Sequence, residues 1–323
     1  MTGKQPSARH RLEYALVASV AWVIRRLPWG LVRLAGRTLG MAFYAFDAPH
    51  RRVTCDNLAR AFPSRSAAEC RAIARGVFRR FGAMLFELLK FSTLSPEEML
   101  DRVEFEGVER VRQAHEAGHG VFLLTGHFGC WEVNGLVHAL RLAPIAVMAR
   151  PLDNPYLHAM LEGVRQRTGN TVIYRRGGIR RTLRALDGGQ AVAILIDQHI
   201  HGPDAVIVDF FNRPASTTTA LGALAARTGA PTLPVFAIPT GPGRYRMVYE
   251  HEVEPPKDES PESIRAFTQR CTDVLEMYVR RHPELWLWMH RRWRDTEVAD
   301  PGDPGMFPPA ARDDGPDQSR DDR

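Results

Sequence analysis

The sequence predicts an α/β fold: a layered sheet with flanking helices, preceded by N-terminal helices that associate with a membrane. From about residue 120 onward, short apolar runs rich in β-forming residues alternate with helical stretches, which is typical of layered α/β proteins. The residues before this point follow the pattern of amphipathic helices. With 323 residues and 44% hydrophobic content, the chain is long enough to bury the core of one large domain.

Two segments near the N-terminus predict helices that lie at a membrane surface. Residues 14–24 (YALVASVAWVI) carry no charge and are flanked by arginines, but a membrane-spanning helix needs roughly 20 apolar residues. Residues 30–46 place Arg33 and Arg37 on one face of a second helix that is otherwise apolar and aromatic. Residues 1–48 are therefore expected to anchor the protein at an interface; whether residues 14–24 span or lie on the membrane stays open, as does packing in an ordinary N-terminal subdomain.

Residues 50–91 predict two or three amphipathic helices. Pro63 and Ser64 interrupt the pattern, and Ser66 is the expected N-cap of the helix that follows. Together with the segments after it, this region forms the predicted main domain, residues 49–295.

Six apolar runs in the main domain predict strands, and these are residues 120–125, 145–149, 171–174, 191–196, 205–211 and 232–238. Between them, helices are expected at residues 154–169, with Asp153 or Asn154 as cap, and at residues 216–229. Two further helices, around residues 261–281 and 286–294, are expected to end the domain. Residues 296–323, rich in proline, glycine and aspartate, predict a disordered acidic tail.

The charge distribution indicates an anionic partner. The net charge is +6, but residues 296–323 contain eight acids and three arginines, so residues 1–295 carry +11. Of the 43 basic residues 40 are arginines, whose planar guanidinium suits phosphate and carboxylate groups. A membrane surface, an acidic substrate or a nucleic acid would fit this charge. Only the charge supports a nucleic acid, because the sequence has no motif that interleaves basic and aromatic residues. A nucleic acid is therefore not expected as a partner.

Cysteine and histidine spacing gives no indication of a metal site or a disulfide framework. The four cysteines lie far apart without a C-x-x-C pair. His199 and His201 are close together, but the sequence suggests no third ligand. No metal is therefore expected.

A histidine followed five positions later by an acid occurs three times, as His127/Glu132, His199/Asp204 and His290/Asp295. Since about one such pair is expected by chance in this composition, spacing alone identifies nothing. His127 differs from the others because it follows a predicted strand and precedes a predicted helix, the position where open α/β sheets bind ligands.

In a regular helix His127 and Glu132 would point roughly 140 degrees apart. They are expected to meet only if His127 lies in the turn before the helix, which Gly126 and Gly129 permit. Glu132 would then accept a hydrogen bond from one ring nitrogen and raise the basicity of the other. The sequence contains no G-x-S-x-G motif, so no acyl-enzyme intermediate is expected. A base that deprotonates a substrate hydroxyl group needs no such nucleophile.

Six motifs resemble, in order and spacing, those of the lipid A biosynthesis late acyltransferase family, which also includes phosphatidylinositol mannoside acyltransferases. They are NLARAFP (57–63), TGHFGCWE (125–132), ARPLDNP (149–155), LIDQHIHG (195–202), the run at 208–236, and RRHPELWLWMHRRW (280–293). The resemblance covers roughly residues 10–295. It implies a fold like that of glycerol-3-phosphate acyltransferase, with N-terminal helices embedded in the membrane.

The resemblance also implies roles for individual residues. His127 falls on the position of the general base and Glu132 on that of its partner carboxylate. Arg150, Asp197 and Gln198 fall on other active-site positions, expected to bind substrate, and Arg150 would suit a phosphate or a developing oxyanion.

The expected function is therefore transfer of a fatty acyl chain from an acyl carrier protein or coenzyme A thioester to a hydroxyl of a glycolipid. A lipid A precursor is the leading acceptor, and phosphatidylinositol mannoside or another glycolipid is the alternative. No cofactor beyond the thioester co-substrate is expected, and the cytoplasmic face of the bacterial inner membrane is the expected location. A lipid-binding protein without catalysis is a second alternative, on the basis of the amphipathic N-terminus and basic body.

Two further segments leave two interpretations open. Ser216 to Thr219 are expected at a helix start, where free backbone amides would bind an anion or where the hydroxyls would only cap the helix. The three tryptophans of residues 283–293 would suit a membrane interface or carrier surface, but equally a core helix.

Overall fold

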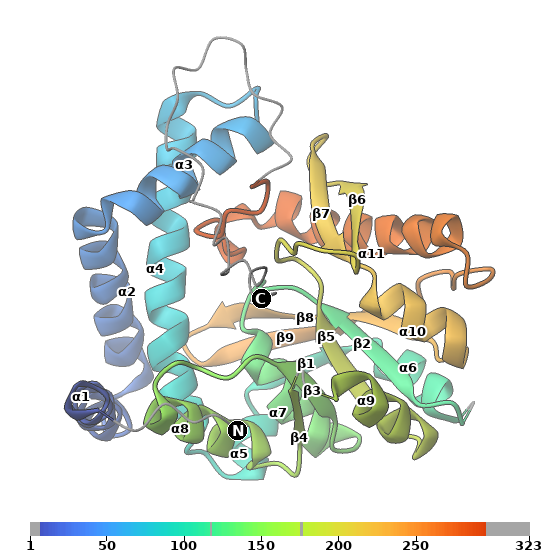
Figure 1. Ribbon diagram of the computed structural model, residues 1–323. Helices are drawn as coiled ribbons and strands as arrows, with labels where there is room; N and C mark the ends of the chain where they lie inside the picture. The colour runs from blue at the N-terminus through green and yellow to red at the C-terminus, as the bar shows by residue number, and fades with distance from the viewer. Residues whose placement is uncertain (1–6, 117, 175–176, 295–323) are drawn as a thin grey trace, which may run out of the picture.

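The computed structural model of the chain describes residues 7–116, 118–174 and 177–294. Within this part, a mostly parallel sheet is covered by helices on both faces (Figure 1), which confirms the layered α/β class. The predicted acidic tail, residues 296–323, lies outside the described residues.

Helices fill most of the N-terminal third and then alternate with strands. The helices are α1 (Ala8–Ile24), α2 (Trp29–Phe46), α3 (Ala48–Ala61), α4 (Ala67–Phe91), α5 (Pro96–Leu100), α6 (Val108–Glu116), α7 (Trp131–Arg141), α8 (Pro155–Gln166), α9 (Gly178–Asp187), α10 (Ala220–Thr228), α11 (Pro261–Arg281) and the short 3₁₀ helix η1 (Pro283–Leu285). The strands are β1 (Val103–Glu106), β2 (Val121–Thr125), β3 (Ala146–Ala149), β4 (Thr171–Tyr174), β5 (Ala191–Leu195), β6 (Ala205–Asp209), β7 (Pro214–Thr218), β8 (Thr232–Gly241) and β9 (Arg244–Tyr249).

The main sheet has the order β1-β9-β8-β2-β5-β3-β4, and a separate hairpin pairs β6 with β7. Strands β8, β2, β5, β3 and β4 are parallel, whereas β9 returns antiparallel to β8. All five residues of β2 are buried, because α6 and α7 cover one face of the sheet and α10 and α11 the other. This explains why β2 is a continuous apolar run and does not alternate.

Most predicted elements are confirmed. The six apolar runs correspond to β2, β3, β4, β5, β6 and β8, and Ser66 caps α4 through a reciprocal pair of hydrogen bonds with Glu69. Asn154 caps α8, because its side chain accepts from the amides of Tyr156 and Leu157. The sequence did not predict β1, β7 or β9, whose charged or hydroxyl side chains interrupt the apolar pattern.

The predicted helix start at Ser216 is wrong. Ser216 to Thr218 belong to β7, and α10 begins at Ala220. The Ser216 hydroxyl donates to the carbonyl of Ile200 and the Thr219 hydroxyl to that of Asp204. These hydroxyls therefore hold the neighbouring loop, and neither caps a helix.

The predicted helix at residues 286–294 is also wrong. After η1 the chain continues as turns, and Trp286, Trp288 and Trp293 are each at most 1% exposed. Their rings pack on Phe210 and Phe211, and all three indole nitrogens donate hydrogen bonds, to Asp197 Oδ2, Pro283 O and Phe210 O. This tryptophan cluster is thus part of the core and not a surface for a membrane or carrier protein.

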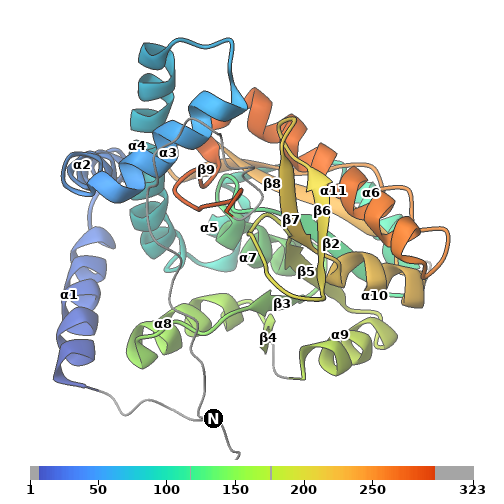
Figure 2. The same ribbon diagram turned by 45° about the horizontal axis from the view of Figure 1, so that its top comes forward.

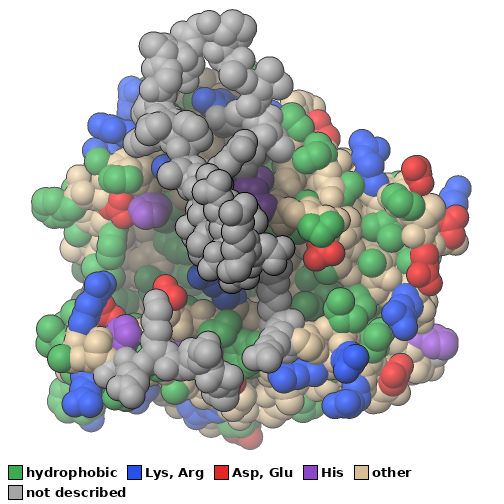
Figure 3. All heavy atoms as spheres, in the orientation of Figure 1, with side chains coloured by type: hydrophobic (Ala, Val, Ile, Leu, Met, Phe, Trp, Pro, Cys, Tyr) green, Lys and Arg blue, Asp and Glu red, His purple; other side chains and the backbone are tan. Residues whose placement is uncertain are grey.

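Apolar side chains are exposed along α1 and α2, which stand at the left of Figures 1 and 2. Leu12, Leu16 and Trp22 of α1 are 73%, 65% and 58% exposed, and Phe46 at the end of α2 is 88% exposed. Figure 3 shows hydrophobic side chains along this edge. Among the helices of the described ranges, none combines the length and apolar composition that a bilayer crossing requires.

Helices α2 and α4 approach each other through glycines. A Cβ atom on Gly40 would lie 2.0 Å from the carbonyl oxygen of Phe78, and one on Gly36 would lie 2.5 Å from that of Gly82. The contact therefore depends on the absence of side chains at these positions.

We expect Gly40→Val to lower the free energy of unfolding by about 3 kcal/mol, because the added carbons would collide with backbone that cannot rotate away. Chemical denaturation in detergent would measure it. Gly30→Val is the matched control, since Gly30 is exposed on the same helix with open space around it. Equal stability of the two variants would contradict the close packing.

Candidate active site

His127 lies in the turn between β2 and α7, as the sequence predicted. Gly129 makes the turn possible, because its φ is +60° and a Cβ atom there would lie 2.1 Å from the carbonyl oxygen of Ala237. The C-terminal segment fixes the turn from the other side: the amide of Leu287 donates to His127 O, and the amide of Gly129 donates to Leu285 O. The histidine is thus held on a rigid loop at the carboxyl end of a central strand.

The carboxylate that contacts His127 is Asp197, which follows β5. Asp197 Oδ1 lies 2.8 Å from His127 Nδ1, and Asp197 Oδ2 accepts from the backbone amide of His127 at 2.7 Å. Oδ2 also accepts from the indole nitrogen of Trp286 at 2.8 Å. Because β2 and β5 are adjacent and parallel, their carboxyl ends bring the two residues together across 70 positions of sequence.

Asp197 is 3% exposed, yet it is held as a carboxylate. Burial raises its pKa, but the charge of His127, the hydrogen bonds from His127 and that from Trp286 outweigh burial and bring the pKa to about 2. A permanently ionised, acceptor-only group next to Nδ1 determines the tautomer: Nδ1 carries the proton and Nε2 keeps its lone pair.

The environment of His127 makes it a stronger base than an ordinary histidine. Burial lowers its pKa, but the charge and hydrogen bond of Asp197 and the more distant charge of Glu132 outweigh burial, and the net pKa is raised. Its side chain is 20% exposed. Nε2 lies 3.3 Å from the side-chain nitrogen of Gln198, an exposed residue next to Asp197. The ring nitrogen that can accept a proton therefore faces the accessible side, where Gln198 lies.

The predicted hydrogen bond between Glu132 and His127 is wrong. Glu132 lies in the first turn of α7 and pairs with Arg165 of α8 instead. Arg165 Nε donates to Glu132 Oε2 at 2.9 Å, and Arg165 Nη2 donates to Oε1, which makes the pair bidentate. The physical reason is the helix: once α7 begins at Trp131, Glu132 turns away from the preceding loop, and Asp197 already occupies Nδ1. Glu132 acts on His127 only through its charge.

We expect the Glu132 and Arg165 pair to contribute to stability, since the two side chains are only 12% and 16% exposed. Glu132→Gln should lower the free energy of unfolding by about 2 kcal/mol, because it leaves a mostly buried guanidinium without its charge partner. Denaturation of Glu132→Gln, Arg165→Gln and the double variant would measure the coupling. A double variant as unstable as the sum of the single ones would contradict the pairing.

Asp197 also differs from its predicted role in direct substrate binding. It is buried, and both oxygens are engaged by His127 and Trp286, so it positions His127 and leaves no surface for a substrate. Gln198 is exposed beside Nε2, as a substrate contact requires. Arg150 is exposed directly after β3, on the far side of β5 from His127. In the part of the chain that the structure describes, its guanidinium makes no hydrogen bond or ion pair.

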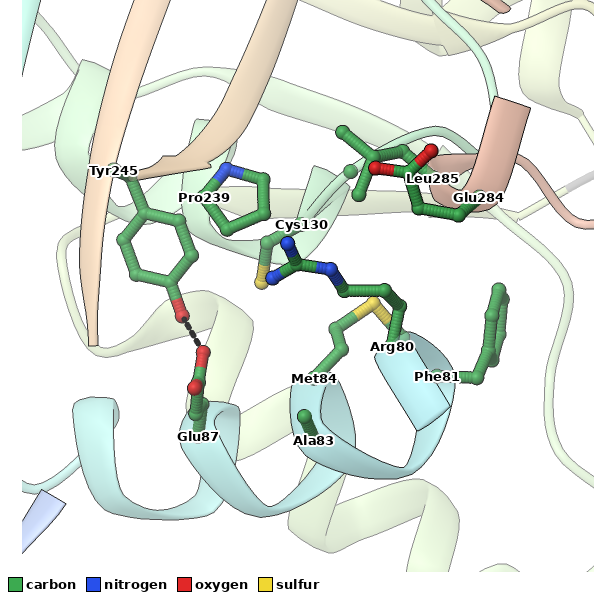
Figure 4. A pocket seen from close by; sticks show the side chains of 11 residues that line it. Arg80, Phe81, Ala83, Met84, Glu87, Cys130, Pro239, Tyr245, Glu284 and Leu285 are labelled. Atoms are coloured by element: carbon green, nitrogen blue, oxygen red, sulfur yellow. Dashed lines mark hydrogen bonds between the residues drawn. The ribbon is translucent and has the colours of Figure 1, made fainter. Parts of the chain in front are cut away.

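A thiol nucleophile is not available beside His127. Cys130 is 2% exposed and lines a small cavity between α4 and the strands β8 and β9, together with Glu87 and Tyr245 (Figure 4). Burial raises the pKa of the Cys130 thiol to about 12. The Tyr245 hydroxyl donates to Glu87 in the same cavity. The site therefore offers a base and no activated thiol.

The histidines near the site do not form a metal centre in the structure. In residues 7–116, 118–174 and 177–294, no three histidine, cysteine, aspartate or glutamate side chains are grouped as metal ligands. The His199 and His201 rings lie 4.4 Å apart, and the backbone amide of His199 donates to Nε2 of His290. Burial lowers the pKa of His290 to about 4, so this histidine is a neutral acceptor that holds the loop after β5.

Sequence reasoning missed two residues of the site, Arg165 and Trp286. Arg165 is one of 40 arginines, and nothing in its helical context distinguishes it. For Trp286 the sequence left a membrane or carrier surface and a core helix open, and it did not indicate the contact with Asp197. The tryptophans follow His282 and Pro283 in a segment without clear periodicity. They were the one signal in the sequence that residues 286–293 belong to the core.

Comparisons with known proteins agree with the sequence motifs. A family model described as bacterial lipid A biosynthesis acyltransferase matches residues 1–295. The chain is 28% identical over 280 residues to the lipid A biosynthesis lauroyltransferase of Escherichia coli K12, covering 85% of this chain and 89% of that protein. It is 27% identical over 241 residues to the lipid A biosynthesis myristoyltransferase of the same organism, covering 74% and 73%. It is also 25% identical over 283 residues to a phosphatidylinositol mannoside acyltransferase of Mycobacterium tuberculosis, covering 85% and 87%.

Proposed function

Since the chain belongs to the bacterial lipid A biosynthesis acyltransferase family, and is therefore an acyltransferase, we propose that it moves a fatty acyl chain from an acyl thioester to a hydroxyl group of a lipid A precursor. The observation that carries the chemistry is the His127–Asp197 pair, whose unprotonated ring nitrogen, Nε2, lies beside the exposed Gln198.

The proposed reaction begins with His127 Nε2, which takes the proton of the acceptor hydroxyl as its oxygen attacks the thioester carbonyl carbon. The carbon–oxygen bond forms, and a tetrahedral oxyanion results. When the oxyanion collapses, the carbon–sulfur bond breaks and the thiolate leaves, and the proton held on His127 passes to it. The products are the ester and a free thiol, and His127 is again neutral.

Asp197 supports this sequence in two ways. Its hydrogen bond fixes the tautomer in which Nε2 is the free base, and its charge stabilises the imidazolium that forms during the reaction. Gln198 is placed to hydrogen-bond the acceptor or the thioester beside Nε2. Arg150, exposed one strand beyond β5, is proposed to bind a phosphate of a substrate.

We further propose that α1 and α2, within residues 1–48, bind the cytoplasmic face of the inner membrane and that the fold is like that of glycerol-3-phosphate acyltransferase. The exposed Leu12, Leu16, Trp22 and Phe46 side chains and the arginines beside them suit an interfacial position. A lipid acceptor could then reach the active site while its acyl chains stay in the bilayer.

A second acceptor class is supported by the mannoside acyltransferase relative, which matches the chain over almost the same length as the lauroyltransferase. The same base would deprotonate a hydroxyl of a mannosylated phosphatidylinositol or another glycolipid. A lipid-binding role without catalysis is not supported, because the named relatives are acyltransferases and the histidine–carboxylate pair is intact.

The test is acyl transfer by the purified protein with detergent-solubilised acceptors, with acyl carrier protein and coenzyme A thioesters as donors and mass spectrometry as readout. We expect the mass of a lipid A precursor to increase by one acyl chain. An increase only with phosphatidylinositol mannoside, or only with another glycolipid, would replace the acceptor and keep the reaction. No increase with any donor and acceptor pair would overturn the proposal.

A further inference from the structure

The face of α9 that points to solvent carries three arginines, Arg180, Arg181 and Arg184, all of them exposed. The opposite face of the helix packs on the sheet through Thr182 and Leu186, which are at most 1% exposed. The three arginines form no ion pair or hydrogen bond with any residue that the structure describes, and Asp187 at the far end of the helix is the one acid on it. Figure 3 shows basic side chains over this region, at the lower right.

An apolar side chain stands next to these arginines. Ile179, in the first turn of α9, is 62% exposed. Protein-docking surfaces combine an apolar contact with a charged rim, and the rim selects an oppositely charged partner. An exposed isoleucine bordered by unpaired guanidinium groups has this composition. We call Ile179, Arg180, Arg181 and Arg184 the α9 patch.

The position of α9 links this patch to the active site. His127 follows β2, Gln198 follows β5, Arg150 follows β3, and α9 follows β4. These four strands are parallel neighbours in the order β2-β5-β3-β4, so their carboxyl ends form one edge of the sheet. The carboxyl ends of β4, which leads into α9, and of β2, which leads to His127, are three strand spacings apart, roughly 14 Å. That is a distance an extended phosphopantetheine arm bridges, and Arg150 lies on the way.

The patch also lies away from the exposed apolar helices. In both Figure 1 and Figure 2, α1 and α2 are at the left and α9 is at the right. If α1 and α2 bind the membrane, α9 remains open to a partner that arrives from solution.

We propose that the α9 patch docks an acidic acyl carrier protein, which delivers its thioester along the row of strand ends to His127. This inference rests on the proposed function and names the donor. A carrier protein fits better than the nucleotide of coenzyme A, because the patch is the outward surface of a helix, whereas small ligands bind in concave sites. Electrostatic docking of this kind is steered by charge and weakens with salt.

The experiment compares the full-length wild type with the charge reversal Arg180→Glu/Arg181→Glu/Arg184→Glu. Binding of acyl carrier protein is measured by titration calorimetry at two salt concentrations. We expect the variant to bind at least about tenfold more weakly at low salt, with a smaller salt dependence. The ratio of kcat/KM for the carrier thioester to that for the coenzyme A thioester should fall by a similar factor. If the charge-reversal variant does not fold, Arg180→Gln/Arg181→Gln/Arg184→Gln replaces it. This variant removes the positive charges without adding negative ones, so the expected loss of binding is smaller.

The matched control is Arg71→Glu/Arg227→Glu/Arg281→Glu, which changes the net charge equally at exposed arginines on α4, α10 and α11. It should leave the donor ratio and carrier affinity unchanged. Equal weakening in both triple variants, unaltered carrier binding by the α9 variant, or a wild type that uses coenzyme A thioesters but does not bind the carrier would each overturn the docking proposal.

Failure of the proposed function has a different signature. A wild type that binds carrier protein through the α9 patch but acylates no acceptor would refute the acceptor chemistry and support the docking surface. If the α9 variant transfers acyl chains to a glycolipid at the wild-type rate with both donors, the docking surface would be refuted and the acceptor chemistry supported.

Discussion

Replacement of His127 with glutamine should lower kcat for acyl transfer by about two to four orders of magnitude, the range that removal of a general base costs. Glutamine can keep a hydrogen bond to Asp197 but cannot accept a proton from a hydroxyl group at neutral pH. Transfer from a carrier or coenzyme A thioester to the preferred glycolipid, followed by mass spectrometry, measures the loss.

His119→Gln is the control for this variant, because His119 is exposed at the start of β2, the end of the strand opposite His127. It should retain wild-type turnover. Thermal melting of both variants separates lost chemistry from lost folding. A His127→Gln protein that is folded and transfers at the wild-type rate would show that the base is another group.

Replacement of Asp197 with asparagine should have the next largest effect, a loss of about two to three orders of magnitude in kcat. The side-chain nitrogen of asparagine cannot accept a hydrogen bond. If it faces the His127 amide and the Trp286 indole, both lose their acceptor, and if it faces Nδ1 it favours the tautomer with the proton on Nε2. The neighbouring negative charge that stabilises the imidazolium is lost as well.

The pH profile distinguishes this positioning role from a general loss of structure. The base must be neutral, and Asp197 raises the pKa of His127 above its ordinary 6.5, so wild-type kcat/KM should fall as pH falls through a value above 6.5. In Asp197→Asn the acid limb should move to lower pH, because burial alone lowers the pKa of the ring. Asp56→Asn, an exposed change on α3, should leave the limb in place. An unmoved limb in the folded Asp197→Asn protein would contradict the assignment.

The fold class and the position of the base were predictable from local sequence. The apolar runs that became β2, β5 and β8 are buried on both faces of the sheet, so their composition alone identifies them as interior strands. His127 was identifiable because two glycines and a strand-to-helix transition are encoded within a few residues of it. Ser66 and Asn154 were predictable as caps for the same reason, since capping is a local interaction.

Elements whose stability comes from distant partners were not predictable. β1 and β9 pair with each other along an edge of the sheet, and their charged side chains hide the pattern. Residues 286–293 contain tryptophan and arginine, which suit an interface as well as a core. Contacts with Phe210 and Phe211, more than 70 residues away, decide that this segment is core.

The sequence by itself determined that a histidine stands at the carboxyl end of a central strand, in a chain whose motifs are those of acyltransferases. Only the tertiary structure decided which acidic residue forms a hydrogen bond with that histidine. Glu132 is only five positions away, but α7 directs its side chain to Arg165. Asp197 is 70 positions away, yet its Oδ1 lies 2.8 Å from His127 Nδ1. The physical reason is that adjacent parallel strands must be joined by long crossovers, so residues that meet at their shared edge are necessarily far apart in sequence.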